Sequence, residues 1–413
     1  MSAKLTIGVD LGTSGVRAAA ISESIGAIAR SSRPIAIETR RDPNRLFFVV
    51  MEVLADLATR VRQPIEALAI CGTSGSFVPL DQHGNPSGPI VLYSDKAAAS
   101  AVTTVAAYAD PSSPVHGPNS PLAKIIGSQC AQFAFEADFV AGRLMGARIP
   151  TDANNALKAG GDPMSLTWHS WTEVCTRNLT RFPKIVAAGK ALGNLSKAVQ
   201  VELGFQNAPI ICAGTTDGCA AALAAGLHTP GDAVTSLGST LILKVISSIP
   251  IVSTPHGIYS HRLLDTWLVG GASNAGGAAL RRHFSDAEIV ALSKKIVPTK
   301  KLDLGYVPLV TSGERFPVCD PYLSPRFDPR PHHDEAFLQG ILESLVRVEH
   351  QGYLALQSSG APAPLKVSAV GNGTKNSAWM GIRKRVLPAP LAKALFNDPA
   401  SGAAILAANR SLV

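Results

Sequence analysis

Two glycine turns, one near the N-terminus and one in mid-chain, constrain the fold of this sequence more than any other feature. Residues 5–11 place apolar side chains at alternate positions and lead into Gly12-Thr13-Ser14-Gly15, after which residues 16–21 form a second apolar run. Apolar alternation on both sides of a glycine turn predicts a β-hairpin. A tip of small residues can bring backbone N–H groups close to phosphate oxygens, because no bulky side chain blocks the approach.

Each of the two turns carries one carboxylate. Asp10 lies at the end of the first predicted strand, and Asp217 follows the apolar run 209–213 and the turn Gly214-Thr215-Thr216. A carboxylate at a strand end can hold a hydrated Mg²⁺, and a second one can accept a proton from a hydroxyl. Phosphoryl transfer to a hydroxyl requires both functions, so the pair favours a phosphotransferase.

These segments resemble the FGGY carbohydrate kinases, the sugar-kinase branch of the actin/Hsp70-like ATPase superfamily. Further glycine-rich segments resemble the loops of that family and follow in its order: residues 236–240, 270–277, 313–317, 371–376 and 402–404. One such cluster alone would be a weak signal, whereas five in order are specific. The resemblance spans about residues 5–407 and is closest to the short D-ribulose kinases of cyanobacteria and plant plastids, a group that is similar to xylulose kinase.

The expected fold is α/β, a two-domain actin/Hsp70-like ATPase (ribonuclease H-like) fold with a central cleft. The chain has 413 residues, which exceeds one ordinary domain. The rhythm of strand, glycine turn and strand at residues 5–93 returns from Pro209, as in a duplicated α/β unit. The resemblance implies a sugar-binding domain at 1–225, a nucleotide-binding domain at 226–397, and a helix at 398–413 that packs back on the first domain.

Apolar periodicity predicts further elements along the chain. Strands beyond the first hairpin are expected at 35–37, 67–71, 77–80 (as the arm of a second hairpin), 90–93 and 366–370. Helices are expected at 42–62, 131–145, 181–192, 336–357 and 400–409.

The resemblance also assigns roles to single residues. Asp217 is expected to be the general base, with helix N-capping as the structural alternative. Asp10 is expected to hold Mg²⁺ through water, with local hydrogen bonding in the hairpin as its alternative. Ser74, together with both aspartates, would bind sugar hydroxyls. For Asp95 a turn or cap role is as well supported as a ligand role, and Lys158 matches the pentulose-kinase pattern without a defined role.

The nucleotide is expected to contact two hairpins and two glycine loops. The N–H groups expected at the phosphates belong to Gly12, Thr13, Gly238, Ser239 and Thr240. The residues expected at the adenosine are Gly271, Gly276, Gly373 and Asn376. The sequence has Gly371-Asn372-Gly373 where the family has three glycines, and we expect the loop to survive because asparagine tolerates left-handed backbone conformations.

Composition limits the other function classes. The net charge is +8, but the basic residues are scattered and their densest cluster, Arg383-Lys384-Arg385, has no interleaved aromatic residues. We therefore expect that cluster to be a solvated face and expect no nucleic-acid partner. The six cysteines show no metal-binding spacing, which predicts small buried side chains in a reducing compartment. No stretch has the length and apolarity of a membrane span, and only four residues precede Leu5, so we expect a cytoplasmic protein, or a plastid-stromal one if a transit peptide was removed.

The leading hypothesis is an ATP- and Mg²⁺-dependent kinase that phosphorylates a terminal hydroxyl of a small ketose, D-ribulose above all. D-xylulose or a polyol is the alternative substrate. A non-catalytic nucleotide-binding protein on the same fold is disfavoured because both aspartates are present, and an Hsp70-like chaperone would need a further substrate domain. The P-loop and nucleophile-elbow signatures are absent: Ala191 follows Gly189-Lys190, and Ser76 stands where the final glycine of the elbow would be.

Overall fold

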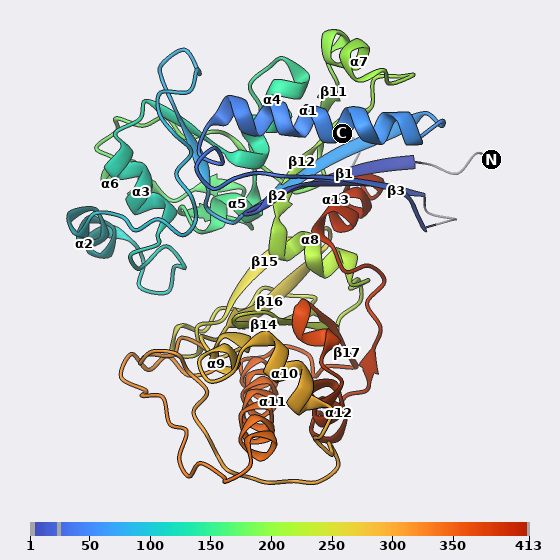
Figure 1. The fold of residues 1–413 in the computed structure, drawn as a ribbon. Helices are drawn as coiled ribbons and strands as arrows, with labels where there is room; N and C mark the ends of the chain where they lie inside the picture. The colour runs from blue at the N-terminus through green and yellow to red at the C-terminus, as the bar shows by residue number, and fades with distance from the viewer. Residues whose placement is uncertain (1–4, 23–25, 411–413) are drawn as a thin grey trace. The chain divides into compact units, whose positions relative to one another are not determined.

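The computed structural model describes residues 5–22 and 26–410, and the chain divides into two units (Figure 1). Unit 1 comprises the chain up to Ala224 together with residues 261–265 and the stretch from Asp398 onward. Unit 2 comprises residues 225–260 and 266–397. Each unit is built on a six-stranded sheet. Within the described residues, no helix is both long and apolar enough to cross a membrane.

The sheet of unit 1 begins with the predicted hairpin. Its strands, in spatial order, are β11 (Ala191–Asn194), β12 (Ile210–Thr216), β4 (Ile65–Gly72), β1 (Leu5–Gly12), β2 (Gly15–Ser22) and β3 (Gly26–Pro34). The central strands β1, β4 and β12 run parallel, and the outer pairs are antiparallel. The carboxyl ends of the three parallel strands therefore meet at one edge of the sheet.

Helices cover both faces of this sheet. Figure 1 shows α1 (Pro43–Arg60) on the opposite side of β1–β3 from α13 (Pro399–Ala408). α1 and α4 (Glu136–Met145) contribute buried apolar side chains to the core, and α13 packs against β1 and α8 (Asp217–Ala224). The approach is so close that a Cβ at Gly8 would lie 1.9 Å from the carbonyl oxygen of Ala400. A glycine in β1 thus lets the C-terminal helix pack on the N-terminal strand.

The rest of unit 1 consists of short elements. Its helices are α2 (Ala99–Tyr108), α3 (Pro121–Ser128), α5 (Ala153–Leu157), α6 (Ser170–Cys175) and α7 (Lys197–Leu203). Its remaining strands form the pairs β5 (Phe77–Leu80) with β6 (Gln132–Phe135), β7 (Thr151–Asp152) with β10 (Ile185–Val186), and β8 (Gly161–Asp162) with β9 (Thr167–Trp168).

The sheet of unit 2 is also mixed. Its strands, in spatial order, are β15 (Tyr259–Leu263), β16 (Thr266–Ala272), β14 (Leu241–Ser247), β13 (Asp232–Leu237), β17 (Lys366–Val370) and β18 (Leu391–Ala392). Of β15, only Tyr259 and Ser260 lie within the residue ranges of unit 2. Its helices are α9 (Gly277–Arg281), α10 (Asp286–Ser293), α11 (Asp334–Ser358) and α12 (Ser377–Val386), with 3₁₀ turns η1 (Thr254–His256) and η2 (Asn372–Lys375). The apolar side chains of α11 join those of β13, β14 and β16 in one core.

Several expected elements are confirmed. The hairpin at 5–22, the helices at 42–62, 336–357 and 400–409, and the strands at 67–71 and 366–370 all occur, with their ends shifted by no more than a few residues. These elements have a strong apolar period and lie between clear turns, so a local pattern is enough to identify them.

Other expected elements are wrong. The third strand is β3, which ends at Pro34 before the predicted 35–37; as an edge strand it is rich in Arg and Ser and lacks the apolar alternation of a buried strand. Residues 181–192 form β10 and the start of β11 instead of a helix, because short pairings with β7 and β12 satisfy their backbone.

The strand predicted at 77–80 is confirmed as β5, but it pairs with β6, and this pairing delays the helix predicted at 131–145 until Glu136. The strand expected at 90–93 is reduced to a single bridge between Val91 and Phe77. The later start of the helix thus arises from a pairing between segments distant in the sequence.

The basic cluster 383–385 is not a solvated face. The Arg383 side chain is fully buried and forms a salt bridge of 2.7 Å with Glu349, and Arg385 forms one of 2.7 Å with Glu343. The expected burial is confirmed for five of the six cysteines, whereas Cys319 is exposed. The reducing compartment stays a prediction.

Candidate active site

The shared carboxyl edge of β1, β4 and β12 brings together the turns that the sequence singled out. Across the parallel pairs, Asp10 lies opposite Cys71, and Cys71 lies opposite Thr215. Asp10 on β1 and Asp217, which follows β12, therefore come to the same edge although half the chain separates them. The charge of Asp217 is one of the causes that raise the pKa of Asp10.

Asp10 is buried and has a cation as its neighbour. Its Oδ2 atom lies 3.2 Å from Nη1 of Arg17, whose side chain is half-exposed. Burial, and to a smaller extent the charge of Asp217, raise the pKa of Asp10 to about 6, although Arg17 acts to lower it. The bond to Arg17 lies within the hairpin, as the local alternative predicts, and the charge of Asp217 acts on Asp10 as well. The contact of Asp10 with Mg²⁺ stays a prediction.

Sequence analysis missed Arg17, although a usable signal was present. The antiparallel register of the hairpin places Asp10 directly opposite Arg17. Residues equidistant from a tight turn face each other in a hairpin, so the turn position alone predicts that pair.

Asp217 is the first residue of α8. The residue before it, Thr216, accepts a hydrogen bond from the N–H of Cys219 at 3.4 Å, so the expected N-cap alternative for Asp217 is wrong. Asp217 Oδ1 accepts a hydrogen bond from the N–H of Gly218 at 2.7 Å. Asp217 therefore has a local anchor for one oxygen and no capping function.

The pKa of Asp217 is raised chiefly by desolvation. The N–H of Gly218 and the charge of Lys158 lower it, and the charge of Glu136 raises it. Lys158 thus lies near enough to affect the ionisation of Asp217, although sequence analysis assigned it no defined role. It directly follows α5, and Asp152 caps the N-terminus of that helix. A carboxylate with a raised pKa is a stronger base than an exposed one.

Ser74 lies in the loop that follows β4. Its Oγ atom is shielded from solvent and has no hydrogen-bond partner among the described residues. Buried hydroxyls in folded proteins almost always have a partner, so this one suits the binding of a polar ligand. The next residue, Gly75, has φ +93°, a conformation that favours glycine.

Asp95 has a structural role. It accepts hydrogen bonds from both terminal nitrogens of Arg41 at 2.7 Å and one from the N–H of Leu92 at 2.9 Å. Hydrogen bonding to Arg41 is the main cause that lowers the pKa of Asp95. Of its two possible roles, the turn role is the one that the structure supports.

Metal binding at this edge would depend on few protein ligands. Among residues 5–22 and 26–410, no group of three or more His, Cys, Asp or Glu side chains could hold a metal ion. Mg²⁺ commonly keeps several waters and takes only one or two carboxylates together with substrate phosphates. Asp10, already paired with Arg17, fits such water-mediated contact better than direct ligation.

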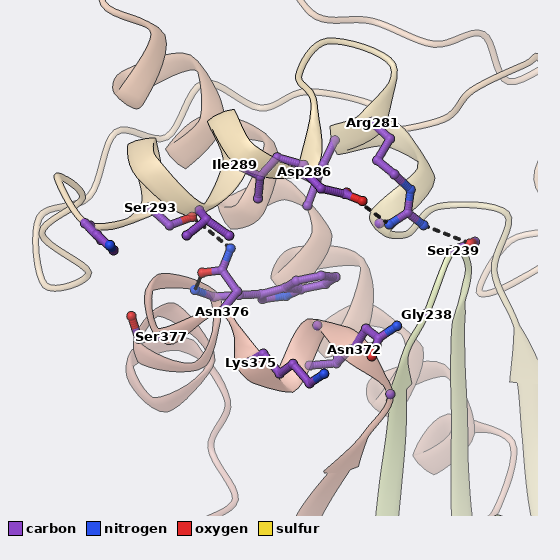
Figure 2. A pocket seen from close by; sticks show the side chains of 18 residues that line it. Gly238, Ser239, Arg281, Asp286, Ile289, Ser293, Asn372, Lys375, Asn376 and Ser377 are labelled. Atoms are coloured by element: carbon purple, nitrogen blue, oxygen red, sulfur yellow. Dashed lines mark hydrogen bonds and ion pairs between the residues drawn. The ribbon is translucent and has the colours of Figure 1, made fainter. Parts of the chain in front are cut away.

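Unit 2 contains a cavity of about 640 Å³ on its own sheet edge (Figure 2). Its lining comes from the tip between β13 and β14, from α9 and α10, and from the loop that precedes α12. Predicted residues that line it are Gly238, Ser239, Gly373 and Asn376. The size is that of a typical small-molecule site.

Polar groups of the cavity are tied to one another, as Figure 2 shows. Arg281 Nη2 donates a hydrogen bond to Ser239 Oγ at 3.0 Å, and Arg281 Nη1 lies 3.8 Å from Asp286. On the other side, Asn376 donates to Ser293 Oγ at 2.8 Å and accepts from the N–H of Trp379 at 3.0 Å. Sequence analysis missed Arg281, which lies one helical turn after a predicted glycine.

The remaining predicted glycines are outside the lining. A Cβ at Gly271 would lie 2.2 Å from the ring of Phe316, so this glycine makes room for the core. A Cβ at Gly276 would lie 2.5 Å from the carbonyl oxygen of Ser239, so this glycine supports the hairpin tip. Thr240 belongs to that tip but does not line the cavity.

The loop that departs from the glycine pattern keeps its shape for a different reason from the expected one. Gly371 has φ +89°, whereas Asn372 begins the 3₁₀ turn η2. Asn372 therefore needs no left-handed conformation. Gly373 is tightly packed: its Cβ would lie 2.6 Å from Leu237 Cβ and 2.8 Å from the Trp379 ring.

The cavity can bind a flat ring together with an anion. Leu237, Ile289 and Trp379 offer apolar surface, and Arg281 and Lys375 offer positive charge. Together with the hairpin tip of small residues, this combination suits a nucleotide.

The chain is similar to known proteins both in sequence and in fold. Residues 5–113 match the N-terminal domain of the FGGY family of carbohydrate kinases. The xylulose kinases of Escherichia coli (strain K12) and Bacillus subtilis (strain 168) are each 23% identical, over 97% and 98% of this chain and 89% and 88% of theirs. The crystal structure of xylulose kinase from Rhodospirillum rubrum is similar with a TM-score of 0.84 and 23% identity, over 98% of this chain and 89% of that one. The expected two-domain α/β fold is thereby confirmed.

Proposed function

We propose that the chain is a sugar kinase of the FGGY family, which it resembles in its N-terminal domain, and that it transfers the γ-phosphoryl group of ATP to a terminal hydroxyl of a small ketose, with D-ribulose converted to D-ribulose 5-phosphate. The observation that carries this proposal is the arrangement of Asp10 and Asp217 at one sheet edge, beside a hairpin tip of small residues. One carboxylate for a metal and one for a proton are the requirements of this transfer.

Asp217 is the proposed general base. The substrate hydroxyl oxygen attacks the γ-phosphorus, the bond from phosphorus to the ADP oxygen breaks, and the hydroxyl proton passes to Asp217. Desolvation raises the pKa of this carboxyl group, which improves proton acceptance near neutral pH. The nearby positive charge of Lys158 lowers the pKa of Asp217 and so opposes part of the effect of desolvation.

Asp10 and the hairpin tip are the proposed phosphate side of unit 1. A hydrated Mg²⁺ near Asp10 would neutralise charge on the β- and γ-phosphate oxygens. The N–H groups of Gly12 and Thr13 would contact those oxygens, since the tip carries only small side chains.

The cavity of unit 2 is the proposed nucleotide site. Gly238, Ser239 and Thr240 would contact the phosphates, and Gly373 and Asn376 would lie at the adenosine. Arg281 supports the tip through its hydrogen bond to Ser239 and adds a positive charge. Gly271 and Gly276 would act indirectly by allowing close packing beneath the loops.

The sugar is proposed to bind at Ser74, Asp10 and Asp217. The unpartnered Ser74 hydroxyl supports this assignment. D-ribulose is preferred because residues 72–75 and 155–158 resemble the ribulose-directed group. D-xylulose is the second candidate, because the relatives reported above are xylulose kinases.

A coupled ADP-release assay over a panel of sugars tests the proposal. We expect kcat/KM for D-ribulose to exceed that for glycerol and hexoses by at least roughly tenfold, with D-xylulose intermediate, because a site built for given hydroxyls is left with unpaired polar groups by other sugars. D-xylulose as the best substrate would select the second candidate. Glycerol equal to D-ribulose would overturn the pentulose assignment, and ADP release that no sugar stimulates would overturn the kinase assignment.

A further inference from the structure

One fully buried ion pair connects the two loops that surround the candidate active site. Arg40, which precedes α1, and Glu136, the first residue of α4, lie 2.6 Å apart, and each side chain is 1% exposed. A buried ion pair contributes little to stability on average, because desolvation offsets the attraction of the charges. Stability alone therefore does not explain this pair, and the hydrogen bonds that its two members make with neighbouring loops suggest another role.

Arg40 anchors the β1–β2 hairpin, whose tip is proposed to contact the phosphates. Its Nε atom donates a hydrogen bond to the carbonyl oxygen of Gly12 at 3.2 Å, and its Nη2 atom donates to that of Leu11 at 3.4 Å. These carbonyls belong to the last two residues of β1, directly before the tip. The guanidinium group thus fixes the peptide units directly before the hairpin tip, and the N–H groups of that tip would face the phosphates.

Glu136 anchors the loop at 72–76, which carries Ser74. Its Oε1 atom accepts hydrogen bonds from the N–H and the hydroxyl of Thr73, both at 2.8 Å. The same hydroxyl lies 2.6 Å from Ser76 Oγ, and the N–H of Glu136 donates to the carbonyl oxygen of Ser76 at 3.1 Å. Ser74 lies between these two anchored residues.

The packing around Glu136 leaves little room for other arrangements. A Cβ at Gly72 would lie 2.9 Å from both Cγ and Oε1 of Glu136. Glu136 also affects Asp217 electrostatically, so its charge reaches the proposed base. The pair therefore acts on the hairpin tip that follows β1, on the loop that carries Ser74, and on the charge environment of Asp217.

We propose that Arg40 and Glu136 are a positioning pair that sets the hairpin tip at 12–15 against the loop 72–76, and so aligns the phosphate with the sugar hydroxyl. The proposal rests on the kinase function given above. Neither side chain is assigned contact with the substrate. Alignment of two reactants lowers the barrier far more than it strengthens binding, so loss of the pair should reduce kcat more than it raises KM.

The central test replaces both members by apolar residues of similar size, Arg40→Met with Glu136→Leu. Removal of both charges avoids leaving one buried and unpaired, but the carbonyl groups of Leu11 and Gly12 and the N–H of Thr73 lose their partners, so we expect a lower melting temperature with a cooperative unfolding transition. We expect kcat to fall at least about 100-fold with the best sugar of the panel, as for misplacement of reacting groups. The matched control makes the same kind of change in the exposed pair Arg330–Asp334 of unit 2, where we expect unchanged kcat.

Two single variants separate positioning from charge pairing. Glu136→Gln keeps an acceptor for Thr73 and should retain kcat within about tenfold of wild type. Arg40→Lys keeps the charge but cannot reach two carbonyls and a carboxylate at once, so kcat should fall at least about tenfold in a folded protein. Should the double variant fail to fold, the Arg40→Lys result decides.

A kcat within about threefold of wild type, in the folded double variant or in Arg40→Lys, would overturn the positioning role. Amide hydrogen exchange gives a readout that needs no sugar: the double variant should exchange faster at 12–15 and 72–76 and unchanged in unit 2. If the wild type phosphorylates no sugar, the proposed function fails, and unchanged exchange at both loops would separately overturn the positioning pair.

Discussion

Replacing Asp10 by asparagine should stabilise the folded protein at alkaline pH while removing its activity. The folded-state pKa of Asp10 is about 6 against an ordinary value of 3.8, mainly because the carboxyl group is buried and secondarily because Asp217 is near. A difference of about two pH units corresponds to about 3 kcal/mol at 25 °C. Asparagine has nearly the same shape and no charge, so it avoids this cost.

The sign follows from proton binding. The folded state holds the proton of Asp10 more tightly than the unfolded state, so the residue costs nothing below pH 3.8. The cost then grows as pH rises and becomes constant above the folded-state pKa of about 6. We therefore expect the Asp10→Asn variant to exceed wild type in free energy of unfolding by about 3 kcal/mol at pH 8, and by less than about 1 kcal/mol at pH 4.

Urea unfolding at both pH values, followed by circular dichroism, measures these differences. The control is Asp56→Asn in the same unit. Asp56 accepts a hydrogen bond from Ser31 at 2.6 Å and has a lowered pKa, chiefly through that bond, so its loss should destabilise the protein at pH 8 and matter less at low pH. An Asp10→Asn variant that is less stable than wild type at pH 8, or whose advantage persists unchanged at pH 4, would refute the reasoning.

Three further changes test other parts of the protein. Asp217→Asn should lower kcat by about 10²–10⁴ while calorimetry still detects ATP binding, because the nucleotide cavity lies in unit 2; turnover near wild type would exclude it as the base. Gly373→Val should weaken ATP binding at least about tenfold through overlap with Leu237, and an unchanged Kd would show that nucleotide binds elsewhere. Glu349→Ala should cost about 3–5 kcal/mol in urea unfolding, because Arg383 is left buried and unpaired; a loss below about 1 kcal/mol contradicts this.

Elements with a strong local signal could be predicted without the structure. The first hairpin, α1 and α11 follow from apolar periods of two and 3.6 residues, because each such period reports one buried face. The place of Asp10 and Asp217 at strand ends could also be predicted, since a carboxylate beside a glycine turn is a local feature, and their chemical roles stay predictions. Arg17 was predictable from the hairpin register but was overlooked.

Elements with a weak local signal could not be predicted. The edge strand β3 has polar residues on both faces, and the two-residue strands β7 and β10 are too short to show a period. These strands form because they pair with partner strands in the folded protein, and that pairing leaves no recognisable pattern in the segment itself.

The sequence by itself determined the first hairpin and the position of two carboxylates beside glycine turns, because these depend on residues close together in the chain, whereas the fold class was expected from the resemblance over residues 5–407. Only the tertiary structure decided the environment of each charge. The parallel register of β1, β4 and β12 brings Asp217 near Asp10, and the packing of α4 buries Glu136 against Arg40. Burial and pairing depend on which distant elements pack together, and no local pattern of residues encodes that.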